Sequence, residues 1–467
     1  MTFCSRTAAT HASATMGSRA TNDVVSSKEP TAPGASTATA HSAPGPHASA
    51  SIVEIADWRS FIVAGPSGVR TARHTVPPST RAVGSPVPRI RGKIVRRRST
   101  GCCSSIRRTV MAPLSVRSFA MSTVYDLSFD QLAERLASWG EPSFRARQVW
   151  TQLWKRGATY EEMSDVSPAL RERLTGALPI GVELLDERTA DRGATRKALL
   201  RLGGTHVIEA VLMGYRDRVT VCVSSQAGCA MGCTFCATGQ MGLRNNLTVG
   251  EIASQVVWGR REAGRLPAAT PQRLSNVVFM GMGEPLANER HVFGALAKLT
   301  QRDGFGMGAR HLTVSTVGIA PGIRRLAYAH PQVGLAVSFH AASDELRDQI
   351  VPPNHRYPLA AVEEAIAAWR SATRRRPSIE WALIDHVNDT VEQAELLAPI
   401  ARRLHAHVNL IPLNPTPGYP VVGSPPARIR TFVTALERAG VNVTVRDTRG
   451  RDIDAACGQL ALSAVGR

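Results

Sequence analysis

From about residue 194 onward, the hydrophobic positions fall into two patterns that take turns along the chain. Short runs rich in Val, Ile and Leu predict strands, and longer stretches with apolar residues three and four positions apart predict helices. Strands are expected at 218–225, 276–280, 312–316, 334–339, 379–384 and 408–412. Helices are expected at 249–261, 291–300, 321–328, 359–370, 391–404 and 427–439. This alternation predicts an α/β fold of parallel β/α units, either a partial barrel or an open sheet.

The residues before these units have a different texture. Segments 129–139, 144–155 and 160–174 show helical apolar spacing, which predicts a small helical domain over residues 122–190. The runs RKALLRL and HVIEAVLM then read as short strands separated by glycine turns. We therefore expect connecting strands over 191–217, followed by the β/α region over 218–462.

The second expected helix, FRARQVWTQLWKRG, mixes basic and aromatic side chains. They are Phe144, Arg145, Arg147, Trp150, Trp154, Lys155 and Arg156. Such a mixture can hold an RNA backbone and stack on bases, which would make the helical domain an RNA-binding accessory domain. The same spacing also describes a helix whose tryptophans pack in the core and whose arginines face solvent, and periodicity alone favours this second interpretation.

Residues 1–120 are rich in Ala, Ser, Thr, Pro and Arg without a sustained period, which predicts a disordered basic leader. They hold 16 Lys or Arg against 4 Asp or Glu, whereas the other residues hold 40 against 33. The net charge of +19 therefore says little about RNA, because the leader supplies most of it. A transit peptide has a similar composition, but no amphipathic helix is evident. We favour a disordered extension or a misplaced start, with Met111 or Met121 as the real beginning.

The cysteines are unevenly distributed along the chain. Four of the eight, Cys222, Cys229, Cys233 and Cys236, lie within fifteen positions. A secreted disulfide framework spreads its cysteines over the fold, so this crowding indicates a reducing compartment with metal or redox chemistry. No apolar run reaches the roughly 18 residues of a membrane span. We expect a cytoplasmic protein without a membrane partner.

Three of these cysteines form the pattern C-x3-C-x2-C on the loop after the first β/α strand, before an expected helix cap at Thr248 and Glu251. Three thiolates can hold three irons of a 4Fe-4S cluster and leave the fourth iron open for a substrate, as catalytic metal sites do. The alternative is structural zinc with a fourth ligand from Cys222, Cys457 or a histidine. Only one zinc-like C-x2-C half is present, which favours iron and sulfur.

The run CVSSQAGCAMGCTFCATGQMG resembles the radical S-adenosylmethionine superfamily, and within it the RlmN/Cfr group, over about residues 144–462. The resemblance implies a partial (β/α)6 barrel, a 4Fe-4S cluster on Cys229, Cys233 and Cys236, and S-adenosylmethionine bound to the open iron, two molecules per turnover. It also implies methylation of an adenine base in 23S ribosomal RNA, near the peptidyl-transferase region.

Several strand ends resemble the cofactor site of that group. The run FMGMGEPLAN contains the matching GMGEP motif, and three further runs, TVSTVG, VSFH and NLIPLNP, end later strands. By this resemblance the cofactor-binding residues are Gly283, Glu284, Ser315, Ser338, Phe339, His340 and Asn414. Each could instead be ordinary turn or cap chemistry, and their collective order supports the cofactor interpretation.

Three more residues match the group's catalytic positions. Cys457, in TRGRDIDAACGQLA, matches the methyl-carrying cysteine; taken alone it is a small buried hydrophobe. Cys222 matches the resolving cysteine, which forms a transient disulfide with Cys457. Glu209, in THVIEAVLM, matches the proton acceptor, and an exposed strand edge is the alternative for its carboxylate. The implied reaction loads a methyl group on Cys457 and adds it to the base as a radical, since carbon 2 of adenine is not nucleophilic.

Two rivals remain open from the sequence. One is methylation of carbon 8 of the same base, as in the Cfr branch, which the residues named above cannot separate from carbon 2. The other is a zinc-stabilised RNA-binding factor without catalysis. We favour the carbon-2 branch because of the helical domain and the long motif run. The implied partners are 23S rRNA, tRNAs with an adenine beside the anticodon, and an electron donor such as flavodoxin or ferredoxin; the enzyme is expected to be a monomer.

Overall fold

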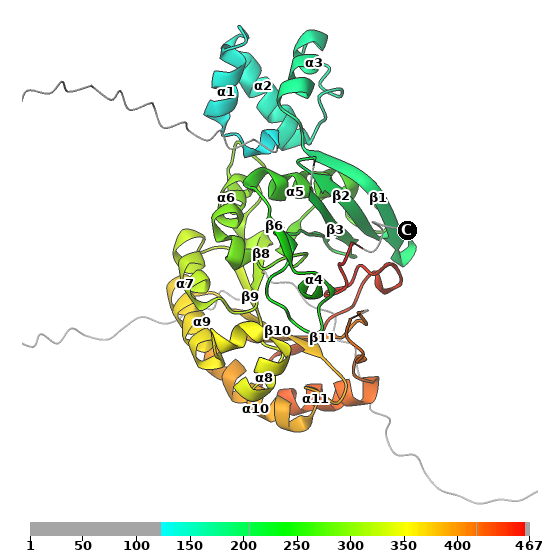
Figure 1. Ribbon diagram of the computed structural model, residues 1–467, viewed down its shortest axis with the longest axis vertical. Helices are drawn as coiled ribbons and strands as arrows, with labels where there is room; N and C mark the ends of the chain where they lie inside the picture. The colour runs from blue at the N-terminus through cyan, green and yellow to red at the C-terminus, as the bar shows by residue number, and fades with distance from the viewer. Residues whose placement is uncertain (1–122, 205, 417, 463–467) are drawn as a thin grey trace, which may run out of the picture. The chain divides into compact units, whose positions relative to one another are not determined.

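The computed structural model describes residues 123–204, 206–416 and 418–462, and the expected leader lies outside the described residues. Their largest feature is a ten-stranded sheet with the order β1-β2-β3-β4-β7-β8-β9-β10-β11-β12 (Figure 1). The strands follow one another in the sheet as they do in the sequence. Because β1 and β12 are edges within the described part, the barrel is not closed.

The second part of the sheet is parallel. Its strands are β4 (Val219–Cys222), β7 (Asn276–Phe279), β8 (Leu312–Thr316), β9 (Gly334–Ser338), β10 (Ser378–Leu383), β11 (His407–Pro412) and β12 (Val443–Val445). The six predicted strands are therefore present, which confirms the α/β partial barrel. The short β12 was not predicted, because three residues give no readable period.

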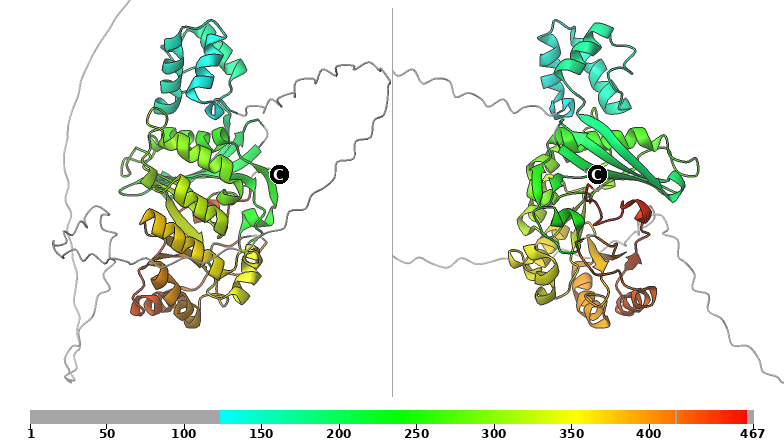
Figure 2. Two further views of the ribbon diagram at one scale, coloured as in Figure 1. Left: turned by 90° about the vertical axis from the view of Figure 1, so that its left-hand side faces the viewer. Right: turned by 45° about the vertical axis from the view of Figure 1, so that its right-hand side comes forward.

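The helices of the β/α units are α5 (Val249–Ala263), α6 (Glu289–Thr300), α7 (Ala320–Ala329), α8 (Asp344–Ile350), α9 (Leu359–Thr373), α10 (Val391–Leu404) and α11 (Pro426–Arg438). All six predicted helices are confirmed to within three residues at either end, and α8 is additional. Successive helices pack along one side of the sheet, and the red C-terminal segment passes on the other side, beside β3 and α4 (Ala237–Gln240) (Figures 1 and 2).

Three antiparallel strands extend the sheet on the β4 side: β1 (Val182–Ala190), β2 (Thr195–Leu202) and β3 (His206–Gly214). The sequence predicted β2 and β3 but not β1, whose residues were assigned to the helical domain. Two features hide it. Most of its side chains are exposed or half-buried, and its pairing shifts at Leu184 and Asp186, so no clean alternation survives.

The N-terminal helices are α1 (Phe129–Ala137), α2 (Ser143–Thr151) and α3 (Pro168–Ala177). Helix α2 continues as a short π-helix over Gln152–Arg156. The prediction of a helix over 160–174 was wrong in its first half. The side chain of Ser167 accepts a hydrogen bond from the amide of Leu170, and Pro168 fills the first helical position, so the helix begins there.

The aromatic residues of the second helix divide between core and surface. Trp150 and Trp154 are buried, which confirms their interpretation as core residues, whereas the Phe144 side chain is 58% exposed. The indole of Trp150 donates to the carbonyl of Asp303, and Lys155 donates to the carbonyl of Arg302. These contacts join the helical domain to the connection between α6 and β8, rather than forming an open stacking platform.

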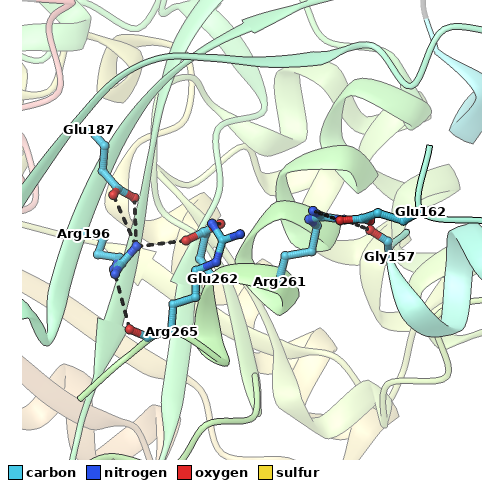
Figure 3. A network of polar contacts seen from close by, with 7 residues as sticks. All are labelled: Gly157, Glu162, Glu187, Arg196, Arg261, Glu262 and Arg265. Atoms are coloured by element: carbon cyan, nitrogen blue, oxygen red, sulfur yellow. Dashed lines mark hydrogen bonds and ion pairs between the residues drawn. The ribbon is translucent and has the colours of Figure 1, made fainter. Parts of the chain in front are cut away.

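Helix α5 joins three parts of the described chain. The predicted capping box is present at its start, with Thr248 and Glu251 bonded reciprocally. Figure 3 shows Arg261 bound to Glu162 and to the carbonyl of Gly157 in the helical domain. The next residue of the helix, Glu262, accepts from Arg196 of β2 at 2.9 Å. This helix therefore positions both the helical domain and the antiparallel extension against the barrel.

The cluster loop has its own small framework. A two-stranded hairpin of β5 (Gln226–Gly228) and β6 (Leu243–Asn246) brackets the segment that holds the three cysteines. Gly228 has φ of 78°, and a Cβ placed there would lie 2.0 Å from the carbonyl oxygen of Gly242. Only glycine permits this close approach of the two strands.

Candidate active site at the carboxyl ends of the parallel strands

A pocket lies where the parallel strands end. It is lined by residues that follow β7 to β11, by the cysteine loop and by the C-terminal segment. Of the residues expected at the cofactor or cluster, those in its wall are Cys233, Cys236, Gly283, Glu284, Ser315, Ser338, His340 and Asn414. Cys457 also lines this pocket. Residues from separate sequence runs thus meet, as the parallel β/α alternation predicts.

Phe339, one of the expected cofactor residues, does not line the pocket with its side chain. Its side chain is fully buried in the main hydrophobic core, and it is absent from the described pocket wall. Its neighbours Ser338, the last residue of β9, and His340, which follows the strand with φ of 59°, both line the pocket. Only its backbone joins the site: the Phe339 amide donates to the carbonyl of Glu380, and its carbonyl accepts from Arg347.

The three cysteines of the loop are free thiols close enough to influence one another electrostatically. Burial raises the pKa of Cys229 to about 12, and it raises the pKa of Cys233 and of Cys236 as well. A cationic metal centre would reverse this effect and hold the thiols as thiolates.

This donor set fits an iron-sulfur cluster better than one zinc ion. No three His, Cys, Asp or Glu side chains among the described residues converge closely enough to hold a single metal ion. In a cubane each thiolate binds a different iron, so the sulfurs need not point at one centre. The other cysteine of the pocket wall, Cys457, already contacts a guanidinium.

Glu284 is almost fully buried in the pocket wall. Its carboxylate accepts from the amides of Leu286 at 2.9 Å and Val317 at 2.8 Å. Burial nevertheless raises the pKa of Glu284 to about 7. The neighbouring Gly283 has φ of 95°, and a Cβ there would lie 2.5 Å from the Cβ of Gln226. The glycine therefore lets the loop pack against the cysteine hairpin.

His340 has a defined tautomer. Its Nδ1 accepts from the amide of Ala382 at 2.9 Å, so the proton of the neutral ring is on Nε2. Burial, and then the nearby Arg347, lower the pKa of His340 to about 3. The ring is edge-on to Phe235 of the cysteine loop, with 4.8 Å between the centroids. His340 thus presents a neutral N–H donor in the pocket wall.

Arg347 is a site residue that sequence reasoning missed. It is fully buried and donates to the carbonyls of Ser338, Phe339 and Val317 and to the side chain of Asn354. These bonds tie the ends of β8 and β9 together beneath the pocket. No local spacing signals this role, because its partners come from separate β/α units.

The two catalytic cysteines expected from the sequence lie at one cavity. Cys222 ends β4 and is buried, Cys457 is half-buried, and both line a small cavity that also contains Arg446. The guanidinium of Arg446 lies 3.1 Å from the sulfur of Cys457. Burial and then Cys457 raise the pKa of Cys222 to about 12, while Cys457 chiefly raises the pKa of Arg446. Arg446, which lies two residues before the recognised run TRGRDIDAACGQLA, was not predicted.

Glu209 is buried in β3 rather than exposed at a strand edge. Its carboxylate pairs with Lys197 of β2 at 3.1 Å and accepts from the amide of Ala461 at 3.0 Å. Lys197 also donates to the carbonyl of Asp454. The carboxylate is thus covered by the C-terminal segment that carries Cys457. Among the described residues, Glu209 lines neither the pocket at the strand ends nor the small cavity of Cys222 and Cys457.

Comparisons with known proteins agree with this arrangement. The model of the radical SAM superfamily matches residues 223–394, and the model of the ribosomal RNA large subunit methyltransferase N-terminal domain matches residues 123–180. A Salinispora tropica protein named "Probable dual-specificity RNA methyltransferase RlmN" is 52% identical over 330 residues, which cover 69% of this chain and 88% of that protein. A Thermobifida fusca protein of the same name is 51% identical over 345 residues, 72% of this chain and 94% of that protein.

A solved structure is similar as well. A radical SAM methyltransferase from Sphaerobacter thermophilus superposes with a TM-score of 0.69 at 46% identity, covering 72% of this chain and 98% of that one. The chain therefore belongs to the radical SAM methyltransferases, and within them to the RlmN family.

Proposed function

We propose that this protein methylates carbon 2 of an adenine in the peptidyl-transferase region of 23S rRNA, and of the adenine beside the anticodon in tRNAs. The observation that supports it most directly is Cys457, paired with Arg446 in the wall of a pocket that also contains two cysteines of the cluster loop. The family match at residues 123–180 favours the carbon-2 branch over carbon 8. The alternative of a zinc-stabilised RNA-binding factor without catalysis is disfavoured. Such a protein would have no use for a further thiol, Cys457, in the same pocket as the cluster cysteines.

As a member of its superfamily, the enzyme uses a 4Fe-4S cluster and S-adenosylmethionine, and the bound cluster supplies the electron that splits the cofactor into a reactive radical. Cys229, Cys233 and Cys236 are the ligands we assign to the cluster. Around the cofactor, Glu284 offers a carboxylate, and His340 offers its Nε2–H. Ser315, Ser338 and Asn414 add short polar groups to the same wall.

The first chemical step belongs to Cys457. Its thiolate attacks the methyl carbon of the sulfonium; a sulfur–carbon bond forms while the bond to the old sulfur breaks with its electron pair. Arg446 stabilises the negative charge on the attacking sulfur through its hydrogen bond. Asn414 holds the loop by donating to the carbonyl of Cys457 at 3.4 Å.

The final steps need a base and a second thiol. Glu209 accepts the proton of the adenine ring, and for this the C-terminal segment must release its bond to the carboxylate. Cys222 then attacks the sulfur of Cys457: a sulfur–sulfur bond forms, the bond from that sulfur to the product carbon breaks, and the product carbon takes the electron pair and a proton. Arg446 is beside both sulfurs and supports the charge on each in turn.

The remaining partners are expectations of the same proposal. A low-potential donor such as flavodoxin or ferredoxin reduces the cluster, and the enzyme acts as a monomer in the cytoplasm. Among the described residues, the structure contains no helix with the length and hydropathy to cross a membrane.

Mass spectrometry of nucleosides tests the function. Deleting the gene should remove 2-methyladenosine from 23S rRNA and tRNA, and restoring the gene should return it. Loss of 8-methyladenosine alone would move the protein to the other branch. No change in either nucleoside would exclude it as an adenine methyltransferase.

A further inference from the structure

A third cavity lies at the amino ends of β10, β11 and β12, between the last turns of α9 and α10 and the connections into these strands. Six of its lining residues are arginines: Arg370, Arg374, Arg375, Arg376, Arg402 and Arg403. No aspartate or glutamate is among the described residues that line it. Because the strands are parallel, the catalytic pocket is at their other end, and the six residues of β10 alone span about 20 Å.

Little in the surroundings neutralises this charge. Arg403 pairs with Glu363, which lies outside the cavity wall. Over the described part of the chain, no carboxylate forms an ion pair with Arg374, Arg376 or Arg402. The crowding affects Arg375, where burial and then the charge of Arg310 lower the pKa of the guanidinium.

Helix ends explain only part of the cluster. The carboxyl end of a helix attracts cations, and Arg370, Arg402 and Arg403 are in the last turns of α9 and α10. The consecutive run 374–376 follows α9, and Arg374 and Arg376 are exposed. A concave surface with this many cations and so few carboxylates attracts an anion with several charges.

We propose that this cavity binds phosphate groups of the RNA substrate, in a segment remote from the target adenine. The inference rests on the proposed function, because it takes the polyanion to be the RNA that the enzyme methylates. Guanidinium forks match phosphate oxygens in pairs, so an RNA backbone satisfies several arginines together. Only an RNA that continues well beyond the target base reaches the opposite end of the strands.

The test compares a long and a short RNA. One is a transcript of the peptidyl-transferase domain of 23S rRNA, and the other is a short hairpin cut from it around the target adenine. Fluorescence anisotropy gives the dissociation constant of the holoenzyme for each over a salt series. The variant is Arg374→Gln with Arg376→Gln. Arg374 has φ of 58°. Because arginine and glutamine both carry a Cβ, replacing one by the other adds no backbone strain at this position.

The matched control is Arg273→Gln with Arg430→Gln. Both side chains are exposed and outside the cavity, and the net charge changes equally. For the long RNA, the cavity variant should bind on the order of ten- to a hundredfold more weakly at low salt, and its plot of log K against log salt should be shallower by about two. Hairpin binding and the control variant should be unchanged, and lysine at both positions should restore the slope.

Two results would overturn the site. Unchanged binding of the long RNA would show that no phosphate is bound there, and equal weakening of hairpin and long RNA would show a general charge effect. Methylation of the hairpin is measured separately. Failure to methylate it, with the expected loss of long-RNA binding, would contradict the proposed function while leaving the cavity as an RNA-binding site.

Discussion

At the scale of single residues, the site depends on charges placed against sulfur. Arg446 donates to a sulfur rather than to a carboxylate, and within the described residues it has no acidic ion-pair partner. A guanidinium in this environment favours a thiolate beside it. Arg446 lines the same small cavity as Cys222 and Cys457, so one cation lies near the two sulfurs that act at different stages of the proposed reaction.

Arg446→Gln should slow methyl loading of Cys457 by about ten- to a hundredfold. A hydrogen bond to a charged group contributes about 1.5–3 kcal/mol, and each 1.4 kcal/mol is a factor of about ten. The methylated Cys457 peptide is quantified by mass spectrometry after incubation of the cluster-loaded enzyme with S-adenosylmethionine. Arg446→Lys should recover part of the rate.

Arg449→Gln is the control for this experiment. Arg449 stacks on Tyr215 and lines the same cavity as Cys222, but its side chain pairs with Asp447 rather than with Cys457. Its rate of loading should match that of the wild type. Equal loading by Arg446→Gln would show that the guanidinium does not activate the thiol.

Glu284 should make stability depend on pH. Its pKa is about 7 in the folded protein against an ordinary value of 4.5, so the folded form holds a proton that the unfolded form releases. The contribution is complete below about pH 4.5 and is lost as pH rises through about 7. From the shift, the loss is at most about 3 kcal/mol.

Urea unfolding of the cluster-free protein at about pH 5 and about pH 8, on either side of the folded-state pKa, measures this contribution. Glu284→Gln removes the titration, so the fall in unfolding free energy between the two pH values should be smaller in the variant than in the wild type. The exposed Glu172→Gln serves as the control and should keep the wild-type difference. Identical pH dependence in all three proteins would mean that Glu284 is already ionised at the lower pH.

At the scale of elements, the sequence predicted those helices and strands that have a clear local hydrophobic pattern. Each predicted β/α strand and helix has a clear period, and the capping box at Thr248 marks the start of α5. The missed element β1 has a bulge and exposed polar residues, and α3 starts later because of Ser167 and Pro168. The three cluster cysteines were predicted from their spacing, whereas the strand-end polar residues, Cys222 and Cys457 were predicted from the family resemblance. Arg347 and Arg446 were not found, because their partners are distant in sequence and only the folded chain brings them together.

The start of α5 illustrates such a distant contact. The amide of Gly250 donates to the carboxylate of Asp126 at 2.7 Å, and a Cβ at Gly250 would lie 2.6 Å from the Asp126 amide nitrogen. Gly250→Ala should therefore lower the free energy of unfolding by about 1–3 kcal/mol, despite the better helix propensity of alanine. Urea denaturation measures the loss.

Gly264→Ala is the matched substitution at the other end of the helix. Gly264 has a helical backbone, and the nearest atom to an added Cβ is 3.6 Å away. Alanine is expected to be neutral there or to stabilise by about 0.4–1 kcal/mol. If both variants had the same stability, the close approach of Asp126 to α5 would not matter for folding.

At the scale of the whole molecule, the residues assigned to chemistry are separate from the helical domain. Every residue assigned to cofactor, cluster or catalysis is in the barrel, the antiparallel extension or the C-terminal segment. The helical domain contributes no described residue to either cavity at the site. It is held to α5 by Arg261, whose guanidinium bonds to Glu162 and to the carbonyl of Gly157 at 2.7 Å (Figure 3).

Arg261→Gln should therefore separate the two activities. Methyl loading of Cys457 should stay near the wild-type rate, because the barrel is intact. We propose that the helical domain holds part of the RNA, and on that proposal methylation of rRNA should fall several-fold, chiefly through a higher KM, because the loosened domain is no longer fixed against the barrel. Limited proteolysis should cut the connection after α3 faster in this variant.

The control is Arg265→Gln. It alters a bond to Glu262 that does not reach the helical domain, so it should leave both activities unchanged. A parallel loss of Cys457 loading and RNA methylation in Arg261→Gln would mean that the helical domain supports the catalytic pocket itself.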